Sequence, residues 1–424
     1  MRRSVRFAFG ATTLTSLFAT PLAAQIDRDR ANVYFKEAEE LCAKDAGKLL
    51  GVSLCGPMAF ADPRTREVVG NEQLPTAPRP PALGFANAAL RWGDKRWSVF
   101  VWPFIPAGDA KARKTLLMHE LVHRVQPEIG LLGADASNDH LDTVDGRYWI
   151  QLEWRALASA LRAKGDAMRA PLSHALAFRR KRHELFATAQ QTERALEINE
   201  GIPQYVATMV VNDSLADAAA HAAAELDAAP RTNATLVRTF PYPAGAAYGV
   251  LLEMHSPGWT RRVKVTDDLA TMLTAAARVQ AASDPDATAS LYGAAALRTA
   301  EVRRDEERKA RVAELRRRFV EGPVVILPNG TQNSFVTNGM TPIPDAGMVY
   351  PTFRTSGEWG SAEAELILMS ADRTRLILPG PAKIDGRTAT GDGWTVRMAV
   401  GWSMRRGTRS GDTQLVKDPP GGPR

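Results

Sequence analysis

The stretch KTLLMHELVHRVQ, residues 114–126, contains the pentapeptide His119-Glu120-Leu121-Val122-His123. Residues four apart lie one turn apart on the same face of a helix, so both imidazoles can bind a single ion. Glu120 projects beside them, toward a water molecule that such an ion would hold. This HExxH pattern predicts a helix with a catalytic zinc site and Glu120 as general base. The alternative is a polar helix face that carries two surface histidines.

A catalytic zinc ion needs a third protein ligand and keeps one position open for water. We expect this ligand to be Glu200, which lies in the segment ALEINEGIPQYVA, residues 195–207. The predicted cofactor is therefore Zn²⁺, held by His119, His123 and Glu200.

Glu153 is the main rival for the third position. It lies closer to His123 in the sequence, in the apolar segment 145–161, where an unpaired carboxylate would be costly to bury. An ion pair with Arg155 or Arg124, or a hydrogen bond to a ligand histidine, would also explain it. The further candidates are Glu197 and His140.

Together these segments resemble the gluzincin group of zinc metallopeptidases, in which a second helix bears a glutamate ligand. In several such families that glutamate opens a segment of the form NEGxAxY, and residues 199–205, NEGIPQY, are similar. Pro203 replaces a common alanine and would bend or begin the helix. The separation of Glu200 from His123 is also longer than in compact members. The resemblance covers about residues 95–255 and implies an exported, bacterial-type zinc peptidase.

A tyrosine that stabilises the oxyanion is also implied by this resemblance. Gluzincin aminopeptidases commonly place it in a segment like YxxGxxxxxxL. The run FPYPAGAAYGVLLE, residues 240–253, offers Tyr242 and Tyr248, with Gly245 permitting close approach. Tyr242 matches better, so we expect Glu120 and Tyr242 to be the catalytic residues. Either tyrosine can instead pack with its hydroxyl group satisfied.

The remaining histidines contribute less to the predicted site. His140 and Asp142 form a polar cluster that either lines the cleft or, as we favour, belongs to a turn that begins a helix. His174, His221 and His255 stand alone and are expected at the surface.

Residues 1–24 have the pattern of a secretory signal peptide, with a cationic start, an apolar stretch and Ala23-Ala24 at its end. The net charge of +7 includes Arg2, Arg3 and Arg6, so cleavage near Ala24 leaves +4. No later segment is apolar enough to span a bilayer. We therefore expect a soluble protein exported to the periplasm or the medium.

The only two cysteines are Cys42 and Cys55. In an oxidising compartment such a pair favours a disulfide over a metal site, with two buried thiols as the alternative. Neither arrangement makes them catalytic.

The pattern of elements predicts an α+β fold: a zincin-like, mostly helical catalytic body with a small N-terminal β-sheet, plus a C-terminal β-rich domain. Helical spacing occurs in 146–163, 172–211, 214–228, 245–256, 266–281 and 288–318. The expected parts are the signal peptide 1–24, an α/β segment with a substrate-side sheet 25–105, the helical catalytic region 106–318, the β-rich domain 322–416 and a disordered tail 417–424.

The sequence thus favours an exported metallohydrolase that cleaves amide bonds in a peptide or protein substrate. The arginines of residues 300–319 are interleaved with acids, which indicates a solvated helix face and no nucleic-acid partner. The alternative from another class is a catalytically inactive, zincin-like scaffold whose β-rich region binds a cell-envelope polymer or a protein partner.

Overall fold

The computed structural model describes residues 26–63, 65–335 and 339–419. The expected signal peptide 1–24 and residues 420–424 of the expected tail lie outside this range. Within the described residues, no helix combines the length and apolar character that crossing a membrane requires.

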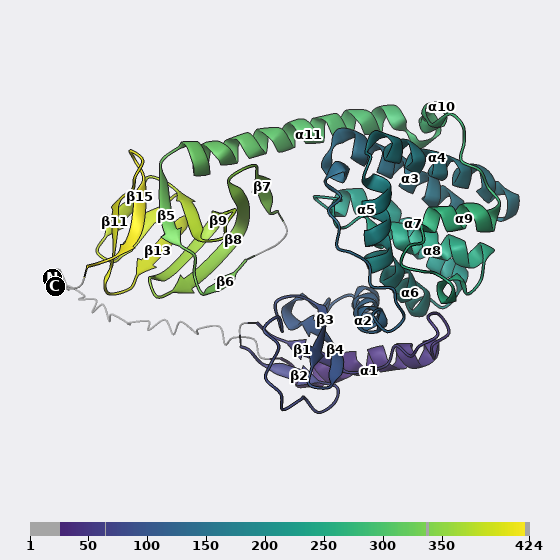
Figure 1. Cartoon of the computed structure of the whole chain (residues 1–424), viewed down its shortest axis with the longest axis horizontal. Helices are drawn as coiled ribbons and strands as arrows, with labels where there is room; N and C mark the ends of the chain where they lie inside the picture. Colours follow the sequence, from purple (N-terminus) through teal and green to yellow (C-terminus); the bar gives the residue numbers. More distant parts are fainter. Residues whose placement is uncertain (1–25, 64, 336–338, 420–424) are drawn as a thin grey trace, which may run out of the picture.

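The N-terminal part is a helix packed on a four-stranded sheet (Figure 1). Its elements are α1 (Arg28–Asp45), β1 (Met58–Ala61), β2 (Val68–Gly70), β3 (Ala88–Trp92) and β4 (Lys95–Val101). The strand order is β2-β1-β4-β3, with β1 parallel to β4 and the other pairs antiparallel. β3 is therefore an edge strand.

Both faces of this sheet are apolar and covered. On one face Phe60 stacks on Phe35 of α1, with ring centroids 4.3 Å apart, and Phe100 packs in the same core. On the other face Trp97 and Val99 pack with apolar side chains of the proline-rich segment 75–84 and its neighbours. The next helix, which carries the HELVH motif, packs against this sheet.

A disulfide between Cys42 and Cys55 ties the end of α1 to the loop before β1, which confirms the predicted bridge. The Cα atoms are 5.2 Å apart, within the normal range for a disulfide. Closing a loop of this length stabilises the fold by about 3 kcal/mol in the chain-entropy model.

The central part is a helical body. Its first helix, α2, packs between the other helices and the N-terminal sheet. Its helices are α2 (Ala110–Val125), α3 (Val144–Arg162), α4 (Arg169–Leu185), α5 (Ala189–Leu196), α6 (Ile202–Val211), α7 (Leu215–Thr232), α8 (Pro241–His255), α9 (Leu269–Ala277) and α10 (Pro285–Ala289). α2 packs on α6 on one side and on β3 and β4 on the other. This position places the HELVH motif at the junction of helices and sheet.

Two details of the helical body differ from the sequence expectation. The segment 172–211, in which helical spacing was continuous, is divided into α4, α5, a π-helical turn Glu197–Gly201 and α6. Pro203 sits in the first turn of α6, where a missing N–H is tolerated. α8 begins at Pro241, which is likewise tolerated in a first helical turn, whereas the expected helix began at residue 245.

α11 (Ala294–Arg316) runs from the helical body to the C-terminal domain (Figure 1). At its start, Glu301 accepts hydrogen bonds from Arg147 and Gln151 of α3 at 2.9 and 2.6 Å. At its end, Leu315 and Phe319 pack in a core with strands of the C-terminal domain. The helix therefore belongs to the cores of both parts.

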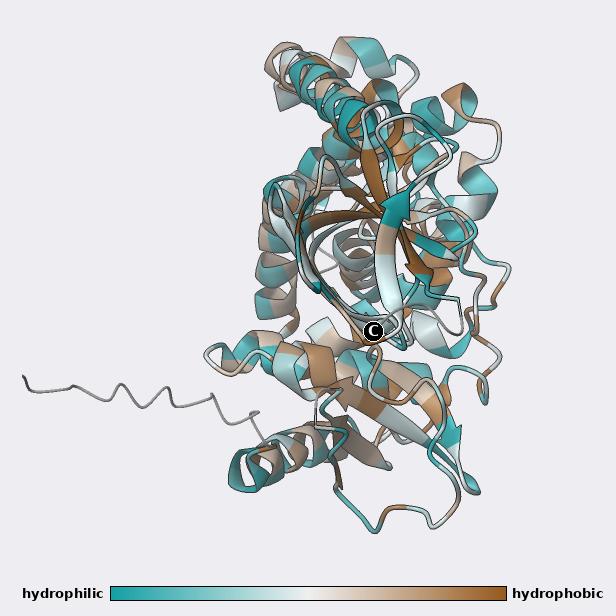
Figure 2. Ribbon diagram, turned by 90° about the vertical axis from the view of Figure 1, so that its left-hand side faces the viewer, coloured by the Kyte–Doolittle hydropathy of each residue, from teal (hydrophilic) through white to brown (hydrophobic). Residues whose placement is uncertain are grey.

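The C-terminal domain is β-rich, as expected, and its described residues form an eleven-stranded sheet. The strands are β5 (Val324–Pro328), β6 (Gln332–Ser334), β7 (Thr341–Ile343), β8 (Gly347–Gly357), β9 (Gly360–Ser370), β10 (Arg375–Pro379), β11 (Lys383–Asp385), β12 (Thr388–Gly391), β13 (Trp394–Met398), β14 (Trp402–Arg406) and β15 (Thr413–Lys417). Figure 2 shows them curving into a barrel-like ring. Trp359 and Trp394 lie in its buried core.

Candidate metal centre

The HELVH motif lies in the C-terminal half of α2. Asp109 caps the start of this helix, because its side chain accepts hydrogen bonds from the backbone N–H groups of Lys111 and Ala112. Packing on both sides covers this half of the helix, so that His119 is only 5% exposed and the His123 side chain 17% exposed. A surface location for the two motif histidines is therefore wrong.

The side chains of His119, His123 and Glu200 converge on one point. The Nε2 atoms of the two histidines are 2.9 Å apart, and Glu200 Oε2 lies 3.2 Å from each of them. In a tetrahedral zinc site with bonds of about 2.0–2.1 Å, ligand atoms are separated by about 3.3 Å. The triangle formed by the three atoms is thus close to the size that a zinc ion requires.

Gln126, which is fully buried at the end of α2, fixes the position of the His123 proton. Its Nε2 donates to the carbonyl oxygens of Ile198 and Asn199 at 3.3 and 2.9 Å, which defines the orientation of the amide. Oε1 therefore faces His123 Nδ1, at 2.6 Å. Because Oε1 only accepts, Nδ1 carries a proton, and in the neutral ring Nε2 presents a lone pair.

The electrostatics of the cluster favour a cation. Burial raises the pKa of the Glu200 carboxyl, but the two imidazoles outweigh this and hold that pKa below its usual value. Burial lowers the pKa of His123, but the Glu200 carboxylate more than offsets this, so the pKa is raised. Within the described part of the chain, Glu200 forms ion pairs only with these two imidazoles. A positive charge at this point, from a metal ion or a proton, relieves the repulsion between the lone pairs.

Glu200 is positioned by the π-helical turn Glu197–Gly201. Pro203 has no N–H, so the carbonyl of Asn199 lacks its usual helical donor, and the Gln126 amide replaces it. The Asn199 side chain in turn donates to Glu200 Oε1 at 3.0 Å, which leaves Oε2 toward the histidines. The departure from NEGxAxY at Pro203 is therefore accommodated by the residue that also orients His123.

Two glycines let α8 approach this turn. A Cβ atom added to Gly245 would lie 2.1 Å from the Cα atom of Gly201. No real side chain fits at that distance, so position 245 needs glycine, and a Cβ on Gly201 would be crowded as well, 3.0 Å from the Cα atom of Gly245. The close approach predicted for Gly245 is confirmed, and it brings the start of α8 to the metal centre.

His119 differs from His123 in its outer contacts. Its Nδ1 atom is buried and has no hydrogen-bond partner among the described residues. Metal-binding histidines usually donate this second N–H to an acceptor, as His123 does to Gln126. A hydrogen bond at Nδ1 therefore orients the His123 ring, whereas the described residues give His119 Nδ1 no such bond.

Glu120 and Tyr242 line the same cleft as His119, a hollow of about 470 Å³. The Glu120 carboxylate forms no hydrogen bond or ion pair with any described residue, and burial raises its pKa. The Tyr242 ring centroid is 5.4 Å from that of His119, and burial, aided by the Glu200 carboxylate, raises the pKa of its hydroxyl group. The structure thus brings both expected catalytic residues to the metal centre. Tyr248 is fully buried elsewhere, where its hydroxyl donates to Glu153.

Glu153, the rival third ligand, belongs to a buried ionic network. Its two carboxylate oxygens accept from Arg182 at 2.6 Å, from Arg179 at 3.4 Å and from Tyr248 at 2.6 Å. The structure therefore explains Glu153 by ion pairs with arginines, although not with Arg124 or Arg155.

Glu197 and His140 belong to the same network. Arg179 donates to both oxygens of Glu197 at 2.7 Å, and His140 contacts Glu193 at 2.8 Å. Burial raises the pKa of Glu193, but Arg182 and the neighbouring histidines outweigh this and hold it well below its usual value. None of these residues points its ligand atoms at the metal centre. Thr143 caps α3 directly after the His140 cluster, which agrees with the favoured helix start.

Several other residues that line the cleft were not anticipated from the sequence. They are Lys111, Gln204, His221 and Glu225. The His221 side chain is only 17% exposed, so the expectation of a surface location for His221 is wrong. His221 contacts Asn212 at 3.0 Å, and its Nε2 lies 3.5 Å from the Glu225 carboxylate. The only available signal was the spacing of four between His221 and Glu225 on one helix.

Comparisons with known proteins give no match: no protein-family model fits the chain, and neither the curated proteins nor the solved structures include a significant relative.

Proposed function

We propose that this chain is an exported, zinc-dependent peptidase of gluzincin-like design. One observation carries the proposal. The lone-pair-bearing atoms of His119, His123 and Glu200 converge within 3.2 Å of one another, in a cleft that also contains a free carboxylate, Glu120. Two imidazoles and one carboxylate form the ligand set of many catalytic zinc sites.

The donor set fits zinc in number, chemistry and spacing. His119 and His123 would bind through Nε2 and Glu200 through Oε2, with the Gln126 amide holding the proton of His123 on the opposite nitrogen. The chemistry supplied by a bound zinc ion is Lewis acidity, which activates water and polarises a carbonyl group.

The chain's own residues supply proton transfer and charge stabilisation. Glu120 accepts a proton from the attacking water and passes it to the leaving amine, a role for which its unpaired carboxylate is suited. The Tyr242 hydroxyl donates a hydrogen bond to the oxygen on which negative charge develops.

The position of the cleft supports a peptide substrate. Asn87, directly before edge strand β3, lines the cleft together with His119 and Glu120. An extended peptide can add to the free edge of a sheet through main-chain hydrogen bonds. Such a peptide would pass beside the metal centre.

The decisive variant is Glu120→Gln, which preserves shape and removes the base. We expect the purified protein to keep one zinc ion per chain while the rate of peptide hydrolysis falls by about 10²–10⁴-fold. Full activity in this variant would overturn the mechanism.

His119→Ala separates the peptidase from a non-catalytic scaffold. A peptidase must lose its zinc and its activity in this variant. Purified wild-type protein that contains no stoichiometric zinc, and whose His119→Ala variant has unchanged stability, would instead support a binding protein.

A further inference from the structure

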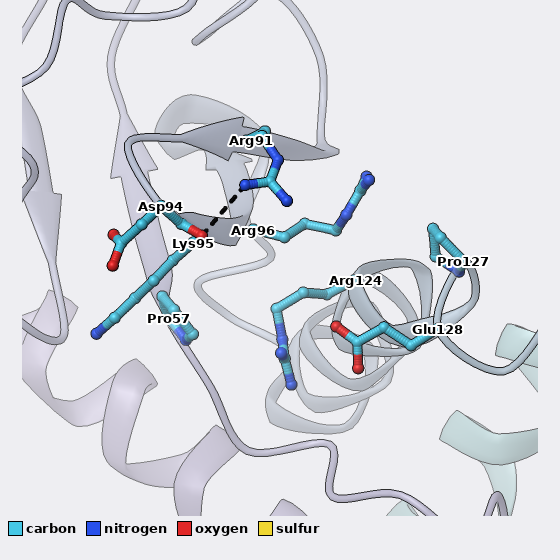
Figure 3. A pocket seen from close by; sticks show the side chains of 8 residues that line it. All are labelled: Pro57, Arg91, Asp94, Lys95, Arg96, Arg124, Pro127 and Glu128. Atoms are coloured by element: carbon cyan, nitrogen blue, oxygen red, sulfur yellow. Dashed lines mark hydrogen bonds between the residues drawn. The ribbon is translucent and has the colours of Figure 1, made fainter.

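A second hollow of about 470 Å³ lies between the β3–β4 hairpin and the C-terminal end of α2 (Figure 3). It is distinct from the metal cleft, and the two share no lining residue. Its charged lining residues are Arg91, Asp94, Lys95, Arg96, Arg124 and Glu128.

The hollow holds more positive than negative charge. Lys95 is neutralised by Glu72, at 2.7 Å. Arg91, Arg96 and Arg124 have no carboxylate within 4.0 Å among the described residues, and their hydrogen bonds go to backbone carbonyls, such as Asp94 O for Arg91 and Ala89 O for Arg96. Figure 3 shows the Asp94 carboxylate turned away from the guanidinium groups, which leaves Glu128 as the one acid facing them.

Arg124 is the buried charged residue of this hollow. Only 9% of it is exposed, and one terminal nitrogen, Nη2, donates to the carbonyls of Ser53, Leu54 and Cys55 at 3.0–3.4 Å. Its Nε is buried and has no hydrogen-bond partner among the described residues. A Cβ atom on Gly56 would lie 2.5 Å from the guanidinium carbon, so a side chain there would displace the guanidinium group. A buried guanidinium with an unused donor is costly unless an anion completes its hydrogen bonds.

The hollow and the metal cleft lie along the same two elements. At edge strand β3, Asn87 at one end lines the cleft and Arg91 near the other end lines the hollow. On α2, Glu120 lines the cleft and Arg124, one helical turn further on, lines the hollow. Four residues of strand span about 13 Å. A peptide paired with β3 would therefore reach both sites at once.

We propose that this hollow binds the carboxylate of an acidic side chain in an extended peptide whose reactive bond lies in the metal cleft. Arg91 and Arg96, on the β3–β4 hairpin, supply guanidinium groups that can bind such a carboxylate in bidentate fashion, and Arg124, whose Nη2 is held by backbone carbonyls, adds positive charge from the helix side. The inference rests on the proposed peptidase function and adds a substrate class: peptides with an aspartate or glutamate about four residues from the cleaved bond.

The test uses binding rather than turnover. Fluorescein-labelled short peptides, neutral except for one aspartate moved along the chain, are titrated into the full-length, zinc-loaded Glu120→Gln protein and followed by anisotropy. Each has a matched peptide with asparagine. At one position we expect the aspartate peptide to bind about tenfold tighter. The variant R91Q/R96Q should remove this advantage and leave the asparagine peptide unchanged. Arg124 is left intact, because its substitution can unfold the loop it supports.

R303Q on α11 is the matched control, since it removes a guanidinium 76% exposed and far along the chain. It should change neither peptide's affinity. Equal binding of aspartate and asparagine peptides, or an advantage that survives in R91Q/R96Q, overturns the proposal. Inorganic phosphate is the second probe: tight phosphate binding lost in R91Q/R96Q, with no aspartate advantage, makes the hollow a free-anion site and also overturns it.

If the wild-type protein cleaves no peptide at all, the proposed function fails, yet the anisotropy result still shows whether the hollow recognises a carboxylate. If it cleaves neutral and acidic peptides equally, the function stands and this inference fails.

Discussion

Three glutamates on one helical run, Glu193, Glu197 and Glu200, have different partners. Arg182 and Arg179 donate to both oxygens of Glu193 and Glu197, respectively. Glu200, one turn further on, faces two imidazoles instead. The first two belong to a buried ionic network with arginines, whereas the third joins a cluster in which electron-pair donors face one another. Glu193 and Glu197 are fully buried and held by arginines, whereas the half-buried Glu200 faces imidazoles, and this difference in partners makes Glu200 the candidate metal ligand.

The distinction has a thermodynamic meaning. In the network, each guanidinium group is hydrogen-bonded to buried carboxylates, so removing one partner leaves a buried charge unpaired at its full desolvation cost. In the cluster of His119, His123 and Glu200 the compensating charge would come from the proposed metal ion, so removing a ligand would take away the binding free energy of that ion.

The largest expected effect is the loss of metal in Glu200→Gln. The amide cannot supply an anionic ligand, so we expect no stoichiometric zinc and no hydrolysis. The free energy of unfolding of the metal-free protein should stay close to that of metal-free wild type, because no arginine is left unpaired. Metal analysis and urea unfolding in the presence of a chelator measure the two quantities. A variant that retains one zinc per chain would show that Glu200 is not the ligand.

Glu193→Gln should give the opposite result. Arg182, which is fully buried, would lose its bidentate partner, and the free energy of unfolding should fall by about 3–5 kcal/mol. The zinc content of the folded protein should remain one per chain. Loss of zinc with unchanged stability would mean that the network and the metal centre are one unit.

The pH dependence of stability should also distinguish the network. Arg179, Arg182, His140 and His183 face Glu193, whose pKa is held well below its usual value. Above about pH 4.3, the usual pKa of a glutamate, the carboxyl is ionised in both states and its stabilisation is complete.

As pH falls below that value, the unfolded state binds the proton first, so the free energy of unfolding decreases. Chemical unfolding of wild type and Glu193→Gln between pH 3 and 7 measures this, and the difference between them should shrink toward the acid end. A difference that grows on acidification would contradict the assignment.

The smallest of these effects is expected for Gln126→Ala. It should lower zinc affinity by about 10–100-fold, the usual effect of removing a residue that orients a ligand histidine. Competition with a chelator measures the affinity. Gln151→Ala is the matched control, since Gln151 is a buried amide that bonds to Arg147 and Glu301 instead. Equal zinc affinities in the two variants would exclude an orienting role for Gln126.

Local pattern was sufficient to predict several features of the fold. The α+β class, the β-rich C-terminal domain and the disulfide follow from hydrophobic spacing, turn residues and cysteine count, which report on neighbouring residues. The convergence of His119 and His123 follows from helical spacing alone. Glu200 was named as their partner through a resemblance, with Glu153 left open.

The remaining features depend on contacts between distant segments. Choosing between Glu200 and Glu153 requires knowing that Arg179 and Arg182 reach Glu153, which no spacing reveals. The role of Gln126 arises because its amide meets carbonyls more than seventy residues away, released by Pro203. His221 was predicted at the surface because a single histidine in the sequence does not indicate that distant segments will form a cleft around it.

The most direct test of the central claim is X-ray anomalous scattering at the zinc edge from crystals of the zinc-loaded protein. We expect one peak per chain, bonded to His119 Nε2 and His123 Nε2 at about 2.0–2.1 Å and to a Glu200 oxygen at about 2.0–2.2 Å. No peak at this point, or a peak coordinated by Glu153 or by other residues, would contradict it.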